Sequence, residues 1–153
     1  MIDDLLALAA RLAKASPNRP RQADLKRAVS TAYYALFHAL AKNGADCMVG
    51  TVRAARANKA WAQTYRALDH GKAKTACEKA RNLAFPQALK DVADAFVELQ
   101  KSRHDADYDP EHRLTRAQAL GAVATAADAV TKLRNSRIQD RRALAALLLF
   151  QKR

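Results

Sequence analysis

The sequence predicts an all-α protein, folded as an antiparallel helical bundle of five to seven helices. Only four glycines and four prolines occur among 153 residues, and alanine, the residue with the highest helix propensity, is abundant throughout. No run of β-branched residues alternates as a strand would. The length matches one ordinary domain, so we expect residues 1–153 to fold as a single unit with short connections.

Breaks in the first half of the chain divide it into four predicted helices. Prolines 17 and 20 interrupt the pattern after a first amphipathic segment, and Gly44 is a natural C-terminal stop for the second. The segment "GADCMVG" between two glycines is expected to be a loop, and Gly71 lies just after the end of the third helix. The four helices are predicted over residues 2–15, 21–43, 51–69 and about 72–83.

The second half predicts three more helices. Pro86 suits a first helical position and opens "PQALKDVADAFVELQKSR", which Pro110 stops. Apolar residues recur there with the spacing of a core-facing stripe, at Leu89, Val92, Ala93, Phe96 and Leu99. Thr115 and Gln118 form a capping box for a helix to about residue 135. "NSRIQDRRALAALLLFQKR" closes the chain as a last helix.

The net charge of +12 is unevenly distributed along the chain. Residues 53–81 carry eight basic and two acidic side chains, and the segment from residue 132 onward carries seven and one. Residues 82–131 carry five and eight. Such an excess of positive charge attracts polyanions and makes binding dependent on salt. We therefore expect contact with nucleic acid rather than with an anionic membrane.

Several other classes of protein are not indicated. No apolar run reaches the roughly 20 residues that span a bilayer, and the first residues are acidic where a secretory signal would be basic. The two cysteines have no metal-binding or disulfide spacing, so a cytoplasmic location is expected. Metallopeptidase, α/β-hydrolase and phosphate-loop motifs do not occur, and no cofactor is predicted.

The segment "DADYD" resembles the start of a calcium-binding loop, but the rest of that motif is missing. A calcium loop counted from Asp105 needs glycine at position six and glutamate at position twelve. These positions hold Pro110 and Arg116. A cation in place of the closing carboxylate excludes this ligand set, so no metal site is predicted and the segment is interpreted as the end of a helix.

The second predicted helix carries a strip of polar and aromatic residues beside its core face. At 100° per residue, Arg27, Tyr34 and His38 fall within about 40° of one another, with Thr31 on the same side. These side chains could form hydrogen bonds between packed helices, or they could line a groove that binds a phosphate backbone.

Two motifs together resemble the HEPN domains of prokaryotes. "STAYYALFHAL" lies on an early helix, and "SRHDADYDP" comes much later in the chain; the similarity covers residues 21 to 135. The resemblance implies a helical bundle, commonly a homodimer, that is related to toxins of toxin–antitoxin pairs and to ribonucleases of defence systems. Relatives cleave RNA without metal by means of an arginine and a histidine that comes after four to six intervening residues. Many work beside a small nucleotidyltransferase partner.

The chain departs from that arginine–histidine pair. The fifth residue after Arg103 is Tyr108, whereas His104 is adjacent to the arginine and His112 lies too far along. Cleavage needs a cation to stabilise the phosphorane and a group to accept the 2′-hydroxyl proton. Arg103 suits the first role and His104 the second, while a phenol such as Tyr108 is a poor base with an ordinary pKa near 10. We predict Arg103, His104 and Tyr108 as catalytic candidates.

The remaining assignments around this motif are supporting ones. Asp105 and Asp107 are predicted to orient the end of the helix, because Asp107 lies one helical turn from Arg103. Arg27, Tyr34 and His38 are the predicted nucleic-acid contacts. The competing hypothesis is a non-catalytic module that binds a nucleotide or docks on a nucleotidyltransferase-type partner, with Tyr108 as a nucleotidylation acceptor.

Overall fold

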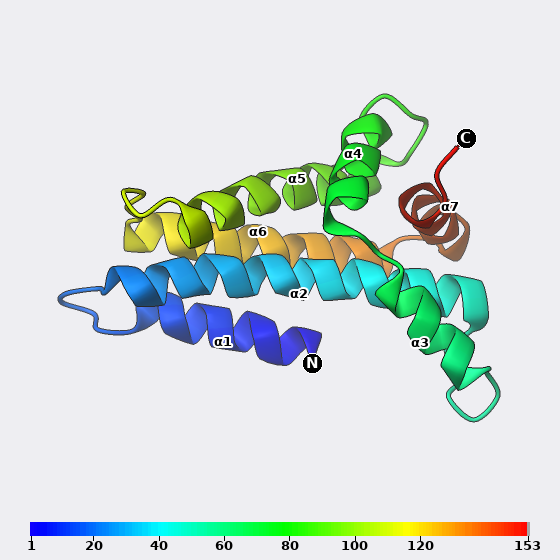
Figure 1. The fold of residues 1–153 in the computed structure, drawn as a ribbon, viewed down its shortest axis with the longest axis horizontal. Helices are drawn as coiled ribbons and strands as arrows, with labels where there is room; N and C mark the ends of the chain where they lie inside the picture. Colours follow the sequence, from blue (N-terminus) through cyan, green and yellow to red (C-terminus); the bar gives the residue numbers. More distant parts are fainter. Residues whose placement is uncertain (153) are drawn as a thin grey trace.

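Helix α2 (Gln22–Val49) is the central element of a helical bundle, and the other helices pack around it. The computed structural model describes residues 1–152, which form seven α-helices and no strand (Figure 1). The other six helices are α1 (Ile2–Lys14), α3 (Asn58–Arg66), α4 (His70–Ala80), α5 (Gln87–Tyr108), α6 (Arg116–Asn135) and α7 (Ile138–Leu149). The predicted all-α bundle is therefore confirmed.

The long helices pack against one another as a bundle and the short ones gather at one end (Figure 1). α1, α2, α5 and α6 lie lengthwise, and consecutive members run in opposite directions where α1 meets α2 and where α5 meets α6 (Figure 1). α3, α4 and α7 lie at the end where α2 finishes. Because α2 is contacted by α1, α3, α5, α6 and α7, more than half of its residues are buried. This burial explains why α2 is not strongly amphipathic.

The predicted stop at Gly44 is wrong. α2 continues through "GADCMVG" to Val49, and Gly50 ends it with a φ of 127°. Gly44 is buried where α7 crosses, and a Cβ atom placed there would lie 3.0 Å from Cδ1 of Leu149. The glycine thus serves close packing between helices and not chain reversal. Of the four glycines, Gly50 alone has the positive φ that favours glycine.

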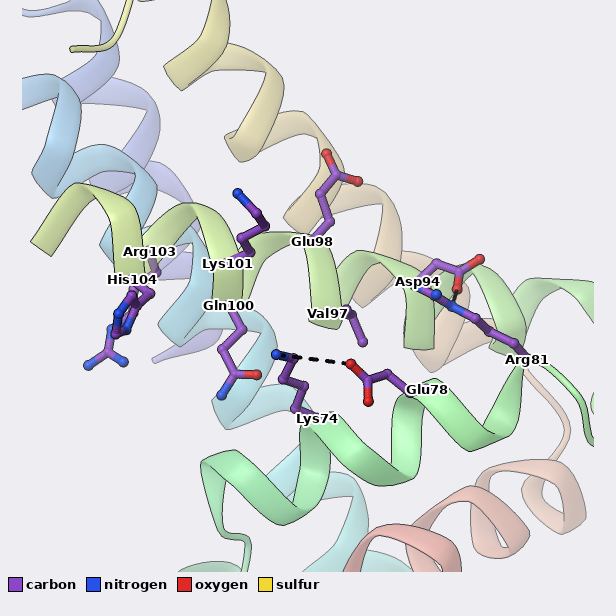
Figure 2. Close-up of a pocket in the computed structure, with 10 residues that line it drawn as sticks. All are labelled: Lys74, Glu78, Arg81, Asp94, Val97, Glu98, Gln100, Lys101, Arg103 and His104. Atoms are coloured by element: carbon purple, nitrogen blue, oxygen red, sulfur yellow. Dashed lines mark hydrogen bonds and ion pairs between the residues drawn. The ribbon is translucent and has the colours of Figure 1, made fainter. Parts of the chain in front are cut away.

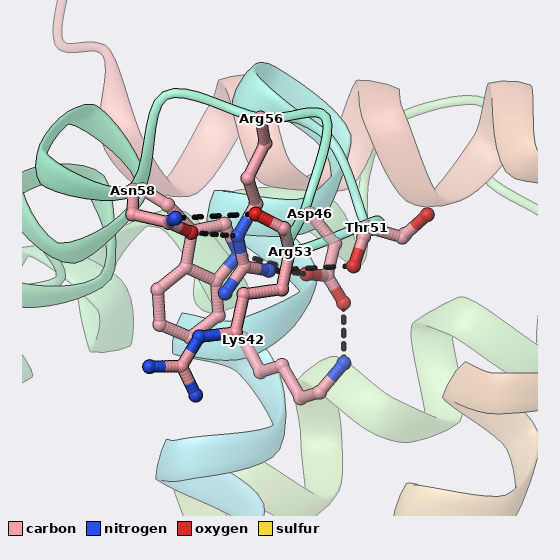
Figure 3. A network of polar contacts seen from close by, with 7 residues as sticks. Lys42, Asp46, Thr51, Arg53, Arg56 and Asn58 are labelled. Atoms are coloured by element: carbon pink, nitrogen blue, oxygen red, sulfur yellow. Dashed lines mark hydrogen bonds and ion pairs between the residues drawn. The ribbon is translucent and has the colours of Figure 1, made fainter.

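A network around Asp46 fixes α3 against the end of α2 (Figure 3). The Asp46 carboxylate accepts hydrogen bonds from Lys42 Nζ at 2.5 Å and from Trp61 Nε1 at 2.9 Å, and Arg56 Nη1 lies 3.7 Å away. The guanidinium carbon of Arg56 is 4.1 Å from the centre of the Trp61 ring. Residues 50–57 lie outside a helix, with Arg56 bound in this network, and α3 begins at Asn58 and not near residue 51 as predicted.

The other element boundaries agree with the sequence to within a few residues. Thr115 and Gln118 form the predicted capping box at the start of α6, and that helix ends at Asn135. Pro86 is the N-cap of α5 instead of its first helical residue. The predicted stripe on α5 is buried, from Leu89 to Leu99. Within residues 1–152, no helix combines the length and the apolar character that crossing a bilayer requires.

Candidate functional site

Arg103 lies near the C-terminal end of α5 and joins that helix to α2. Its Nη2 donates a hydrogen bond of 3.1 Å to the hydroxyl oxygen of Tyr34. Its Nε lies 3.0 Å from a carboxylate oxygen of Asp107, one turn further along α5, but the contact is an ion pair without hydrogen-bond geometry. The Arg103 side chain is 17% exposed. The guanidinium is therefore held on one edge and partly enclosed.

Three phenol rings surround this guanidinium. Its central carbon is 5.6 Å from the centre of the Tyr33 ring, 5.5 Å from that of Tyr34 and 5.6 Å from that of Tyr108. The negative face of an aromatic ring attracts a cation at such distances. Burial opposes the charge of Arg103, but the nearby phenols and the Asp107 carboxylate more than offset it, so the pKa of Arg103 lies above its ordinary value. Arg103 keeps its positive charge at every pH of interest.

The guanidinium opens into a groove between α4 and α5. The groove has a volume of about 1010 Å³, and Arg103 and His104 lie at one end of it (Figure 2). At the other end Arg81 pairs with Asp94, and on α4 Lys74 lies 4.0 Å from Glu78. Within each of these pairs the two charges cancel, and Glu98 adds a further carboxylate. The groove therefore has a mixed charge. The Arg103 end is the part that suits an anion.

The other predicted catalytic residues lie on the exposed side of α5. His104 is exposed and its ring centre is 4.9 Å from that of Tyr108, which is itself 63% exposed. Neither side chain makes a hydrogen bond within residues 1–152. Asp107 accepts a hydrogen bond of 3.3 Å from Ser30 Oγ in addition to pairing with Arg103, whereas Asp105 pairs with Lys101 at 3.1 Å. Of the two aspartates, Asp107 is the one that contacts Arg103.

The strip predicted on α2 is divided between different partners. Tyr34 belongs to the Arg103 cluster. His38 Nδ1 lies 2.6 Å from the hydroxyl oxygen of Tyr65 on α3, and burial lowers the pKa of His38. Arg27 is exposed and makes no ion pair or side-chain hydrogen bond with the described residues. The three residues lie on one helix, but their partners differ: Tyr34 is hydrogen-bonded to α5, His38 to α3, and Arg27 to neither.

His70, the first residue of α4, is part of the Arg103 cluster although the sequence did not single it out. Its Nδ1 lies 2.5 Å from the hydroxyl oxygen of the fully buried Tyr33. Its ring stacks on Phe37 with centres 4.0 Å apart and meets Tyr34 edge-on at 6.0 Å. Burial, and secondarily the charge of Arg103, lower the pKa of His70. His70 joins the cluster because the tertiary structure places the start of α4 against side chains of α2 and α5.

Local structure explains why His70 is held so firmly. Asp69 caps α4 by accepting a hydrogen bond of 2.8 Å from the backbone N–H of Lys72. The carbonyl oxygen of His70 accepts a hydrogen bond of 3.0 Å from Gln100 Nε2 on α5. A signal was present in the sequence, an aspartate before a histidine at a helix start, but it is common and specifies no function.

Among residues 1–152, no three or more His, Cys, Asp or Glu side chains lie close enough together to hold a metal ion. Comparisons with protein families, with curated proteins and with solved structures found no match for this chain. A functional assignment therefore depends on the geometry of the Arg103 cluster and on the motifs in the sequence.

Proposed function

We propose that the chain is an HEPN-like, RNA-directed protein that binds an RNA phosphate at Arg103 and cleaves the strand without metal. The observation that supports this proposal is the setting of Arg103. Its guanidinium is surrounded by phenol rings, pairs with a single carboxylate and opens at the end of a groove. An arginine can bind phosphate oxygens with two parallel hydrogen bonds, and it stays charged throughout the reaction.

The proposed cleavage needs only the RNA, water and the side chains of this site. His104, exposed beside Arg103, accepts the proton of an RNA 2′-hydroxyl, and the 2′-oxygen attacks the adjacent phosphorus. The bond to the 5′-oxygen breaks, that oxygen takes a proton from water, and the hydroxide that remains takes the proton from His104, which regenerates the water and the neutral imidazole. Arg103 stabilises the negative charge that develops on the phosphoryl oxygens. The products are a 2′,3′-cyclic phosphate and a 5′-hydroxyl end.

The distribution of charge favours the Arg103 end as the position of the reacting phosphate. In the rest of the groove Glu78 and Asp94 are paired with Lys74 and Arg81, and Glu98 adds a further carboxylate, so that part gives a polyanion little net attraction. The HEPN resemblance adds the expectation of a homodimer in which two copies place this end of α5 in a shared basic cleft. Analytical ultracentrifugation of wild type tests the dimer; a monomer at every concentration contradicts that part of the proposal.

The cleavage proposal is tested with labelled RNA in excess chelator. Wild type is expected to generate 2′,3′-cyclic ends, and Arg103→Ala to lose this activity. Arg81→Ala is the matched control, because Arg81 lines the same groove but is paired with Asp94 at its far end. If Arg103→Ala cleaves and binds RNA as wild type does, the proposal is wrong.

A second candidate function is favoured by the exposure of Tyr108. Its side chain is 63% exposed, so its hydroxyl is reachable by a partner enzyme. In this alternative, a nucleotidyltransferase-type partner uses Tyr108 as an acceptor: the phenol oxygen attacks the α-phosphate of a nucleoside triphosphate and pyrophosphate leaves. Intact mass after incubation with the partner and ATP tests it. An adduct on wild type that Tyr108→Phe lacks supports this function, and no adduct contradicts it.

A further inference from the structure

Besides Arg103 Nε, which is buried against Asp107, three hydrogen-bond donors of this cluster have no acceptor within residues 1–152. Nη1 of Arg103 donates to no side chain or carbonyl, and the Tyr34 hydroxyl accepts from Arg103 but donates to nothing. His70 uses Nδ1 internally, and its Nε2 has no partner. Neither Nη1 nor Nε2 belongs to the enclosed polar atoms that lack partners, so both reach solvent.

The bond between Tyr33 and His70 determines which ring nitrogen carries the proton. Tyr33 is fully buried, and its hydroxyl has no other partner among the described residues. If Nδ1 carried the proton, the Tyr33 hydroxyl hydrogen would be left buried without an acceptor, which is unfavourable. The hydroxyl therefore donates to Nδ1, and the proton of the neutral imidazole lies on Nε2. His70 is consequently a hydrogen-bond donor toward solvent and not a base.

The three donors belong to one rigid cluster. Arg103 and His70 both contact Tyr34, the first through its hydroxyl at 3.1 Å and the second edge-on to its ring at 6.0 Å. Both also contact Tyr33. Stacking on Phe37 and the hydrogen bond from Gln100 fix the position of His70. Donors that are held in place before a ligand arrives cost little to order on binding.

We propose that Arg103, Tyr34 and His70 form a clamp for a single phosphate group. One guanidinium, one neutral phenol and one neutral imidazole provide several donors but one positive charge, which matches the single negative charge of a phosphodiester. The clamp rests on the proposed function, because it takes RNA as the natural ligand. It adds two binding residues to Arg103, namely Tyr34 on α2 and His70 on α4. The phosphate of a free nucleotide has the same chemistry, so affinities for RNA and for a nucleotide are needed to separate the two sources.

The tautomer of His70 is measured directly by NMR on protein labelled with ¹⁵N-histidine. At a pH above the ordinary histidine pKa of about 6.5, two-bond correlations are expected to show the proton on Nε2. Titration of an uncleavable 2′-O-methyl RNA dodecamer is expected to shift the Nε2 resonance. A proton on Nδ1, or an Nε2 signal that RNA does not move, overturns the clamp.

Affinity for the same dodecamer and for ADP provides the second test. Tyr34→Phe removes one donor, and the double variant Tyr33→Phe/His70→Phe removes another without leaving the buried hydroxyl unpaired. Each is expected to weaken RNA binding about tenfold, the usual effect of a lost hydrogen bond to a charged group. His112→Gln, on the loop after α5, is the control and is expected to bind as wild type. Circular dichroism verifies that each variant folds.

The pattern of losses distinguishes the proposals. Weaker binding of both RNA and ADP assigns the clamp to any phosphate, and weaker binding of RNA alone assigns it to the diester. If Arg103→Ala weakens RNA binding but the Tyr34 and His70 variants do not, the clamp is wrong and the proposed function stands. If Arg103→Ala has no effect either, both are wrong.

Discussion

The Asp46 cluster and the Arg103 cluster are built from the same kinds of side chain, but a different charge lies at the centre of each. At the junction of α2 and α3 an anion is central, and Lys42, Arg56 and Trp61 direct donors at it. At the end of α5 a cation is central, with one carboxylate and three aromatic rings around it. The first cluster satisfies its central group, and the second leaves donors for a ligand.

Under the proposed function, this contrast distinguishes the Asp46 cluster, which stabilises the fold, from the Arg103 cluster, which is proposed to bind a ligand. Aromatic faces stabilise a cation without occupying its N–H groups, whereas a carboxylate with three partners has little capacity left. The two clusters should therefore respond in opposite ways to substitution. Substitution of Arg103 should lower activity with little effect on stability, and substitution of Asp46 should lower stability with little effect on activity.

The largest effect is expected from Arg103→Ala on RNA cleavage. Loss of a group that stabilises transition-state charge typically lowers the rate about 10²- to 10³-fold. The midpoint of urea unfolding should change much less than the cleavage rate, because the hydrogen bond, the ion pair and the contacts with three aromatic rings that link Arg103 to the fold are each of modest strength. Comparison of initial rates and unfolding curves for wild type and variant makes the check. Equal loss of stability and activity would erase the contrast between the clusters.

The next effect is expected from Asp46→Ala on stability. Removal of the carboxylate leaves Trp61 Nε1 and the cations without their acceptor, which should cost about 2–3 kcal/mol of unfolding free energy. RNA cleavage below the melting temperature should remain close to that of wild type, since the Arg103 cluster is untouched. A folded Asp46→Ala protein with unchanged stability would show that the network is incidental.

A smaller effect, opposite in sign, is expected from Asp107→Asn. Asp107 is the carboxylate that competes with an incoming phosphate for Arg103, at 3.0 Å from Nε. Neutralising it should strengthen RNA binding about threefold, the size expected for a partly exposed ion pair. Asp105→Asn is the control, because Asp105 pairs with Lys101. Fluorescence anisotropy measures both affinities; weaker binding by Asp107→Asn would mean that the ion pair orients Arg103 productively.

The smallest effect is expected from pH on stability. Burial lowers the pKa values of His38 and His70 in the folded protein, with Arg103 adding to the shift at His70. As pH falls through the unfolded value of about 6.5, the unfolded chain binds protons before the folded one, so stability decreases toward pH 5. The double variant Tyr33→Phe/His70→Phe should reduce this slope. A flat profile of unfolding free energy between pH 7 and pH 5 would contradict it.

The sequence predicted the helices far better than it predicted the site. Periodic apolar residues and the Thr115 capping box located α5 and α6, because these signals act within one helix. Gly44 misled because the role of a glycine in helix packing depends on α7, about a hundred residues further along the chain. Motif and spacing singled out Arg103 and Tyr34 as candidates, and their side chains are joined by a hydrogen bond. His70 was missed because only the tertiary fold brings the start of α4 to Tyr33.

The most direct test of the Arg103 cluster as a phosphate site is the structure of the protein bound to an RNA with a 2′-deoxy group at the cleaved position. A phosphate oxygen is expected within about 3 Å of Arg103 Nη1, with Tyr34 and His70 Nε2 as its other donors. A phosphate bound elsewhere, with Arg103 still paired only to Asp107 and Tyr34, would contradict this role.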